Sequence, residues 1–431
     1  MSTTTTGLTC PDCAERLYRV DNGPSWCPAC EWNLGNLGEA LTAPRGWGWL
    51  VRRSHRTAFR LDQEQFTKYS ARRPDGPEPS TVGRILLAVS LLLIAVVAAT
   101  AAYGVVLITH GGLAFVGGAA LILVAVVLRP RLGKLPKRGH RLKRTDYPAL
   151  YSLVDQVAQA AGAHAPDVIA VDFAFNASTW RAGIRQRRVL NLGLPLWLVL
   201  EPQQHVALLA HEIGHQVNGD PMRSLLVQPA MRTFGALARY THVSQRSFDR
   251  VMYGSPRAAG RGALLELLIM LAMKLFSSIC LLIHAALNAL GFRDRQRAEY
   301  LADGIAVDIA GSTAMIGLAD RLILMPQIAN IIGYNAETQR VSQWRALADT
   351  LSTSRAEQLP LLRQLTARNT TLWAQHPPAG LRARMAEAWP ATEPRVSLTA
   401  QESTAINAEL RDWFKATHAK ILGSRSFRGR N

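Results

Sequence analysis

No apolar core follows the first methionine of this chain, because residues 1–8 are rich in threonine, and we expect no secretory signal. Acidic side chains are scarce, with 31 against 49 basic ones in 431 residues. The resulting formal charge of +18 implies an anionic neighbour, either nucleic acid or lipid headgroups. The apolar residues gather in long segments, which favours a lipid bilayer, and no nucleic-acid partner is expected. Internal repeats are absent, and the length allows two or three domains.

Histidine is also infrequent, with eleven in the chain, yet two of them stand four apart in His211-Glu212-Ile213-Gly214-His215. Acidic and proline residues at 201–202, with glycine and proline near residue 220, predict a helix around this motif. On that helix His211 and His215 share a face and can bind one zinc ion. A third protein ligand would leave one position for a zinc-activated water, with Glu212 as the general base. A buried helix that carries two histidines by chance is the alternative.

Cysteine is scarce as well, but four of the five cysteines form two C-x-x-C pairs, Cys10 with Cys13 and Cys27 with Cys30. This spacing predicts a zinc ribbon in residues 1–45, in which four thiolates close a structural zinc site. So small a ribbon depends on its metal for folding. Two disulfides are the alternative, and the lack of an export signal favours zinc. The sequence does not identify the ribbon's partner.

The apolar residues between the ribbon and the histidine motif predict a membrane anchor. Residues 46–83 are basic and proline-rich and indicate a linker, and residues 84–128 predict a transmembrane helical hairpin with crossings at 85–109 and 113–128. Basic residues flank both ends of this hairpin, so both ends are expected to face the cytoplasm. We therefore expect a multi-pass protein of the cell membrane, with the ribbon and the metal helix on the cytoplasmic side.

Short strands precede the metal helix. Residues 147–161 have helical periodicity, and residues 168–173 and 188–192 read as neighbouring strands. A short sheet followed by a metal-binding helix is the minimal zincin layout, in which an edge strand holds an extended substrate. The predicted fold class is mainly α with a small β-sheet, an α+β zincin of the gluzincin type, in residues 129–395.

A third metal ligand must come from farther along the chain. Glu299 and Asp303 are four apart and would share a helix face, where Glu299 can bind zinc and Asp303 can hydrogen-bond a ligating histidine. A solvated acidic face gives the same spacing, so this pattern alone leaves both interpretations open.

Several motifs together resemble the M48 family of membrane zinc metallopeptidases, which includes HtpX-type quality-control proteases and CAAX prenyl proteases. The resemblance runs from Tyr147 to Arg384. The matching elements are His211–His215 with Asp220, Asn176-Ala177, Leu192-Gly193-Leu194, Glu299-x-x-x-Asp303, Gln375-His376-Pro377-Pro378 and Arg382. One departure is Gln296, three residues before Glu299, where the family often has arginine; Arg295 and Arg297 stand on either side.

The resemblance implies roles for these residues. His211, His215 and Glu299 would bind the catalytic zinc, with Glu212 as base. Asn176 and His376 would hold the substrate or the oxyanion, and Arg382 would support that corner. We place Asp303 and Asp220 with Arg382 among the residues that surround the ligands.

The apolar residues 263–290 could form a further crossing. One crossing between His215 and Glu299 would place two ligands on opposite sides of the membrane, so residues 222–240 would have to cross as well. Three arginines and a proline make 222–240 a poor crossing. We therefore expect 263–290 to be an apolar core helix, or a membrane-associated helix or in-plane hairpin that rests on the bilayer. The tail, residues 396–431, is polar and is expected to contain one helical stretch around residues 409–414, and its basic end, residues 425–430, is expected to be disordered or lipid-facing.

These observations predict a membrane-anchored zinc endopeptidase with two zinc ions, one catalytic and one structural. The expected substrate is a protein or peptide, in membrane protein quality control. The alternatives are a CAAX-type protease of prenylated peptides and a non-catalytic scaffold whose zinc ribbon recruits a partner.

Overall fold

The computed structural model describes residues 3–20, 25–33, 48–74, 76, 81–129, 133–183, 185–217, 233–239, 261–335, 338, 340–374 and 376–428. These belong to two compact units. Unit 1 comprises residues within 1–78, 133–221 and 293–431, and unit 2 comprises residues within 79–132 and 222–292. Helices dominate both units, and the two sheets are small, which confirms the predicted fold class.

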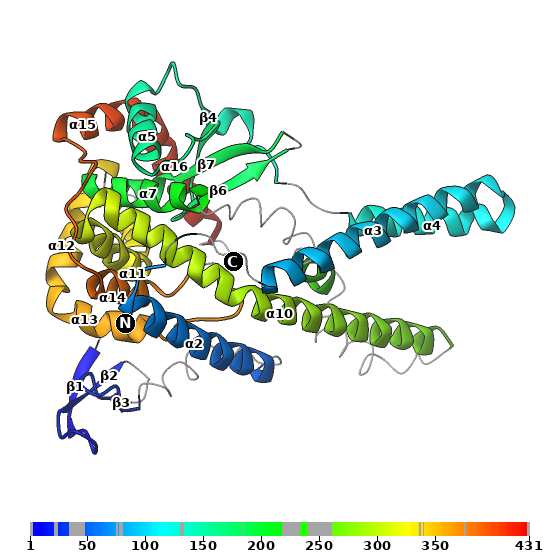
Figure 1. The fold of residues 1–431 in the computed structure, drawn as a ribbon, viewed down its shortest axis with the longest axis horizontal. Helices are drawn as coiled ribbons and strands as arrows, with labels where there is room; N and C mark the ends of the chain where they lie inside the picture. The colour runs from blue at the N-terminus through cyan, green and yellow to red at the C-terminus, as the bar shows by residue number, and fades with distance from the viewer. Residues whose placement is uncertain are drawn as a thin grey trace. The chain divides into compact units, whose positions relative to one another are not determined.

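Unit 1 holds both sheets and most helices (Figure 1). Its strands are β1 (Thr3–Thr9), β2 (Arg16–Val20), β3 (Ser25–Trp26), β4 (Arg141–Leu142), β5 (Val168–Asp172), β6 (Ala177–Ala182) and β7 (Arg187–Gly193). Its helices are α2 (Gly48–Ala71), α5 (Pro148–Ala160), α6 (Leu194–Val199), α7 (Pro202–Val217), α11 (Ser312–Asn335), α12 (Trp344–Ser354), α13 (Leu359–Thr366), α14 (Ala379–Ala388), α15 (Ala400–Glu409) and α16 (Arg411–Arg428). Short 3-10 turns lie at η1 (Arg138–His140), η3 (Val341–Gln343) and η4 (Ala356–Gln358).

The sheet in front of the metal helix has the order β4-β5-β7-β6. The two strands expected from the sequence, β5 and β7, are parallel neighbours, with Ala170 opposite Asn191. The sequence interpretation did not identify β6, which pairs antiparallel with β7 and forms one edge of the sheet. Within the described residues no strand pairs with the other side of β6. Gly133 lies against the backbone of Arg181 near the end of this strand, so the first part of β6 is available for a further extended chain.

The metal helix α7 is buried along most of its length. Helix α5 has buried residues at the predicted helical spacing, including Leu150, Val154 and Val157, and it packs against the same core as α7. In α7 every residue from Gln204 to Gly214 is buried, because the sheet, α5 and α11 enclose it. The predicted helix is confirmed; its predicted end near residue 220 lies outside the described residues.

Residues 48–71 form the helix α2, so the prediction of a loop-like linker over 46–83 is wrong for this segment. The buried face of α2 alternates polar and apolar side chains, and hydropathy therefore gives little signal. That face consists of Ser54, His55, Ala58, Leu61, Asp62, Gln65 and Tyr69. Three of its groups have partners in unit 1: His55 Nε2 lies 2.7 Å from the carbonyl oxygen of Arg368, Ser54 Oγ accepts from the Leu372 amide at 3.1 Å, and the Tyr69 carbonyl accepts from Trp389 Nε1 at 2.7 Å.

The tail is also helical over residues 400–428, which confirms the helical stretch expected around residues 409–414, whereas the disorder expected for the basic end is wrong for residues 425–428. Helix α15 begins with a capping box between Thr399 and Glu402. At its other end the Glu409 carboxylate accepts hydrogen bonds from the amides of Ala149 and Leu150, the first turn of α5, at 2.7 and 3.0 Å. The tail thus caps a helix of the sheet-bearing region.

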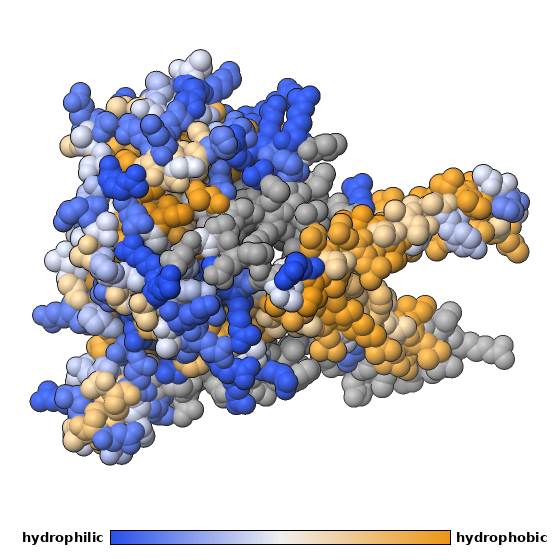
Figure 2. Space-filling view, in the orientation of Figure 1, coloured by the Kyte–Doolittle hydropathy of each residue, from blue (hydrophilic) through white to orange (hydrophobic). Residues whose placement is uncertain are grey.

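Unit 2 contains α3 (Thr81–Thr109) and α4 (Gly112–Leu128), the hairpin expected from the sequence. The two helices run side by side (Figure 1). Their backbones approach closely at Gly104 and Gly118, where a Cβ on Gly118 would lie 2.5 Å from the Gly104 carbonyl oxygen. Their outward side chains are apolar and exposed, including Leu92, Leu113 and Leu123 (Figure 2). Such a surface is stable in lipid, and the chain is therefore a membrane protein.

One continuous helix, α10 (Arg261–Ala310), contains both the apolar segment 263–290 and Glu299. The expected in-plane hairpin is therefore wrong. A core helix is wrong too, because large apolar side chains of this segment are exposed, as Figure 2 shows for the first half of α10, and the membrane-associated helix stays the prediction. These are Leu268, Ile269, Leu275, Phe276, Ile279 and Leu282. The segment is long and apolar enough to cross a membrane, as is α3.

Helix α11 has similar hydropathy but a different environment. Its Leu318, Leu324 and Ile328 are at most 1% exposed in the core of unit 1, and its Arg321 pairs with Asp349 at 2.6 Å. A buried arginine with a carboxylate partner fits a protein interior, so we assign α11 to the core and not to the membrane.

Candidate metal centre

Helices α7 and α10 bring three candidate zinc ligands together. The Nε2 atoms of His211 and His215 lie 3.3 Å apart, since the two residues are one turn apart on α7. Glu299 of α10 faces both, with Oε2 at 3.5 Å from His211 Nε2 and Oε1 at 3.6 Å from His215 Nε2. The three side chains are 3%, 14% and 7% exposed, respectively.

The spacing of these donors suits zinc. Ligands held about 2.1 Å from a tetrahedral zinc ion lie about 3.4 Å apart. Two imidazoles and one carboxylate are the ligand set of a catalytic site, which leaves a fourth position open. Burial lowers the pKa of His211, with Arg382 adding to the effect, and a neutral imidazole is the form that binds metal.

Asp303 and Arg382 lie behind His211. Asp303 Oδ1 is 2.8 Å from His211 Nδ1, and Arg382 donates to both oxygens of Asp303, at 2.6 and 3.0 Å. A ring proton on Nδ1 that is donated to Asp303 leaves the Nε2 lone pair directed at the metal position. Burial opposes the charge of Arg382, but the Asp303 carboxylate outweighs it and raises the pKa of this arginine.

His376 joins the ligand cluster from the segment between α13 and α14. Its Nδ1 lies 2.7 Å from Glu299 Oε2, and the donor atoms of His211, His215, Glu299 and His376 all lie within 4.8 Å of one another. The Glu299 carboxylate raises the pKa of His376 against the opposing effect of burial. The His376 imidazole therefore stands beside Glu299 at the edge of the metal position.

The other predicted site residues are placed less centrally. Glu212 is 3% exposed, and the hydroxyl of Thr179 on β6 donates to its carbonyl oxygen at 3.2 Å, which ties the edge strand to the metal helix. Asn176 is exposed just before β6, and its carbonyl oxygen accepts a hydrogen bond from Gly193 at 2.9 Å. Asp220 and Gln375 lie outside the described residues.

Sequence reasoning did not assign roles to Thr179 or Arg295. Arg295 lies one turn before Glu299 on α10 and donates to the Leu372 carbonyl at 2.9 Å, which ties α10 to the segment that leads to His376. Gln296, the departure from the family pattern, is buried at 1% exposure. The hydrogen bond from Thr179 to a backbone carbonyl leaves no signal in the sequence. For Arg295 there is a weak signal, because arginines stand on both sides of Gln296.

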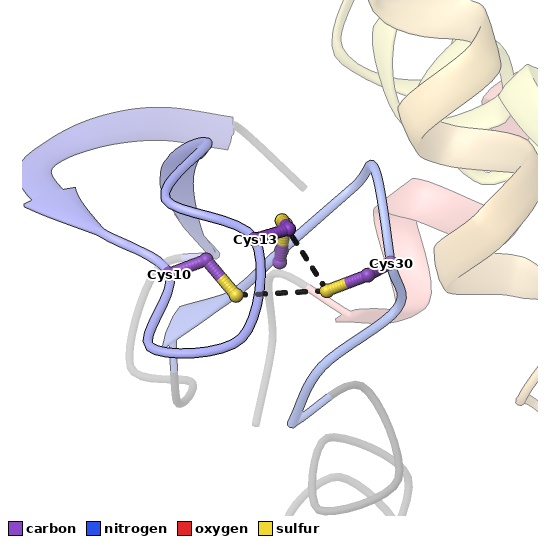
Figure 3. A group of neighbouring side chains, drawn as sticks. Cys10, Cys13 and Cys30 are labelled. Atoms are coloured by element: carbon purple, nitrogen blue, oxygen red, sulfur yellow. Dashed lines mark hydrogen bonds between the residues drawn. The ribbon is translucent and has the colours of Figure 1, made fainter.

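The four ribbon cysteines form a second cluster suited to zinc. The sulfur of Cys30 is 3.5 Å from those of Cys10 and Cys13, and the three labelled side chains point toward one another (Figure 3). The sulfur of Cys13 is 3.4 Å from that of Cys27. These separations are far above the roughly 2.05 Å of a disulfide and close to the roughly 3.8 Å between thiolates on one zinc ion. The cysteine cluster therefore fits the predicted zinc ribbon, and none of the four forms a disulfide.

Comparison with known proteins finds relatives that carry the name "Protease HtpX". "Protease HtpX" of Pseudomonas fluorescens strain Pf-5 is 27% identical over 194 residues, covering 43% of this chain and 62% of the relative. The proteins of the same name from Pseudomonas putida strain GB-1 and Stutzerimonas stutzeri strain A1501 are also 27% identical, over 62% and 63% of their lengths. The match thus spans about three-fifths of each relative. No solved structure gives a significant match.

The comparison with protein families adds the assignment. Peptidase family M48 matches residues 145–390, more than half of the chain. This region contains α7, the second half of α10 and the His376 segment, which are the elements that form the metal centre. The chain therefore belongs to Peptidase family M48, as an HtpX-like member with an added N-terminal zinc ribbon.

Proposed function

We propose that this chain is a membrane-bound zinc endopeptidase. The observation that supports the proposal best is the buried triangle of His211, His215 and Glu299, with donor atoms 3.3–3.6 Å apart. Bound zinc supplies a Lewis acid that polarises the scissile carbonyl and lowers the pKa of water.

The chain's own residues would carry the remaining steps. Glu212, next to His211 on the buried helix, takes the proton of the attacking water and passes it to the leaving amine. His376, with a raised pKa, donates a hydrogen bond to the developing oxyanion. Arg382 supports this side of the site through its hydrogen bonds to Asp303. The free edge of β6, tied to α7 by Thr179, aligns an extended substrate. Asn176, beside β6, would contact this substrate.

The proposed membrane arrangement follows from the metal site, because one zinc ion must bind side chains of both α7 and α10. Residues 233–239 are helical and pack along α10 in unit 2, where Ser277 Oγ donates to the Ala238 carbonyl at 2.8 Å. We propose that residues 233–239 lie in the bilayer beside the apolar half of α10, which crosses it, in the same unit as α3 and α4. His215 and Glu299 lie on the same side only if the chain between them crosses an even number of times, and the basic residues around the first hairpin favour the cytoplasm for that side.

We propose unfolded or damaged membrane proteins as the substrate class. The name of the relatives specifies no substrate. The test is cleavage of reduced, unfolded casein by the detergent-purified full chain, with and without a zinc chelator. Glu212→Gln is expected to retain bound zinc and to lower kcat by about 10²–10⁴-fold. Glu393→Gln changes an exposed loop glutamate and serves as the matched control.

The outcomes separate the alternatives. Cleavage of a prenylated peptide without cleavage of casein would replace the quality-control proposal with a CAAX-type activity. A chain with full zinc content that cuts neither substrate would contradict the peptidase proposal and favour a scaffold that recruits a partner through its ribbon.

A further inference from the structure

The two zinc knuckles of the ribbon share one backbone turn but differ in the residue that follows the second cysteine. Ala14 and Glu31 occupy this position, and both have φ of 59°. The turns close alike: Cys10 N donates to the Glu15 carbonyl at 2.7 Å, and Cys27 N donates to the Trp32 carbonyl at 3.0 Å. Left-handed backbone has a similar cost for any residue with a Cβ, so the turn itself gives no reason for a glutamate at 31.

Glu31 instead contacts the region of unit 1 that follows α13. Its Oε1 accepts a hydrogen bond from Arg384 Nη1 at 3.2 Å, and its Oε2 lies 3.7 Å from Arg368 Nη2. In the same knuckle the Pro28 carbonyl accepts from Gln364 Nε2 at 2.8 Å. The Arg368 and Arg384 side chains are 15% and 33% exposed, so solvent screens these pairs only in part.

Both arginines are held on a second side by α2. The guanidinium of Arg368 lies 4.4 Å from the ring centroid of Phe59, and that of Arg384 lies 5.2 Å from the ring centroid of Phe66. Cation–π contacts of this kind restrict the arginine side chains. Glu31 therefore meets two guanidinium groups that are already fixed in place.

These arginines bracket the segment that completes the metal centre. His376 lies between them, and Arg382 precedes Arg384 by two residues on α14. His376 contacts Glu299 at 2.7 Å, and Arg382 lies 3.1 Å from His211 Nδ1 in addition to its bonds to Asp303. A shift of residues 368–384 would thus move two side chains relative to the ligands.

We propose that the second zinc knuckle positions this side of the metal centre, with Glu31 as a positioning residue that acts through Arg368 and Arg384. The consequence for catalysis rests on the proposed peptidase function. Zinc in the ribbon fixes the turn that presents Glu31, so loss of that zinc loosens residues 368–384 and lowers turnover without touching the catalytic ligands.

The experiment measures hydrogen–deuterium exchange of the full chain in detergent, with zinc content, kcat and KM. Glu31→Ala is accommodated by the turn, since Ala14 occupies the equivalent position. It should retain all bound zinc, speed exchange in residues 368–384 by about three- to tenfold, and lower kcat by a similar factor with little change in KM. Glu15→Ala is the matched control, because Glu15 is exposed and bonds the amide of Arg16 at 3.3 Å.

Two further variants test whether the second zinc knuckle acts through the contacts of Glu31 with Arg368 and Arg384. Cys30→Ser should lose the ribbon zinc and reproduce the faster exchange in 368–384. Reversing the pair, with Glu31→Arg and Arg384→Glu together, should recover part of the loss seen in each single variant. Unchanged exchange in Glu31→Ala, or a lower melting temperature alone, would overturn the proposal. If the wild type cuts no substrate, the peptidase proposal fails, and the exchange measurement still decides this one.

Discussion

Gly214 of α7 lies directly against Ala302 of α10, with no room for a side chain between them. A Cβ built on Gly214 would be 3.0 Å from the Cα of Ala302 and 3.2 Å from its Cβ. Gly214 precedes the ligand His215, and Ala302 lies between Glu299 and Asp303. The close approach of the two helices therefore sets the distance between the histidines and the glutamate.

A larger residue at this contact should weaken the metal centre. Gly214→Val would push α10 away from α7. Because the donor atoms form a triangle with sides of 3.3–3.6 Å, the Glu299 carboxylate would then be too far from a zinc ion bound by the two histidines. We expect zinc affinity at this site to fall by at least about tenfold, measured by competition with a chelator. The matched control is Gly304→Ala on α10, where the new Cβ would meet Trp389 at an ordinary 4.0 Å. Equal zinc affinity in both variants would contradict this account of the packing.

Asp303 should control the affinity of the site through His211. Asp303→Asn removes the charge that accepts from Nδ1 at 2.8 Å and that pairs with Arg382, so the imidazole becomes a poorer ligand. Zinc affinity is expected to fall by about 10–100-fold. Asp308→Asn lies on the same helix and breaks a half-exposed pair with Arg73, and it should leave zinc binding unchanged. Isothermal titration of the metal-depleted variants measures both, and an unaffected Asp303→Asn would remove this aspartate from the centre.

The ligand helix could be predicted from sequence because its information is local. Two histidines four apart with helix signals on both sides define α7, and β5, β7 and α5 follow from periodicity over a few residues. The helix α2 could not be predicted in this way. Its buried face includes Ser54, His55, Asp62 and Gln65, and the partners of the first two lie 318 and 313 residues away, at the Leu372 amide and the Arg368 carbonyl.

The parts of the site outside α7 could not be predicted from local sequence either. Glu299 and Asp303 show helical spacing, but only the fold distinguishes them from a solvated acidic face. The contacts of Glu31 with Arg368 and Arg384 join residues more than 330 positions apart and involve no motif. The tail differs, since the Thr399-x-x-Glu402 capping box was a readable signal for α15.

Asp62 should make stability depend on pH in a defined direction. Burial raises the pKa of Asp62 from an ordinary value of 3.8 to about 7, against a smaller opposing effect of the Thr370 hydroxyl. Between these two values the folded state binds more protons than the unfolded state. The free energy of unfolding from this group therefore falls as pH rises from about 4 to about 7, and it stays low above that.

Asp62→Asn removes this dependence. Relative to the wild type, the variant should gain about 2 kcal/mol more stability at pH 8 than at pH 5, as each pKa unit is worth roughly 1.4 kcal/mol and relaxation reduces the full effect. Chemical unfolding in detergent at both pH values measures the difference. Asp412→Asn, at a position 92% exposed, is the control and should show the same stability difference at both pH values. A wild type and Asp62→Asn with parallel pH profiles would contradict the raised pKa.

The membrane hairpin should depend on Gly118 and not on the adjacent Gly117. A Cβ on Gly118 would lie 2.5 Å from the Gly104 carbonyl oxygen and 2.9 Å from the Ile108 amide, both backbone atoms of α3 that cannot move aside alone. Gly118→Leu must therefore separate α3 from α4, whose contact relies on close backbone approach. Nothing lies within 4 Å of a Cβ on Gly117, so Gly117→Leu adds the same side chain facing outward. We expect the melting temperature in detergent to fall by a few degrees for Gly118→Leu, from overpacking of about 1–3 kcal/mol, and to stay within about a degree of the wild type for Gly117→Leu. Equal effects of the two leucines would mean that the hairpin is not held together at this contact.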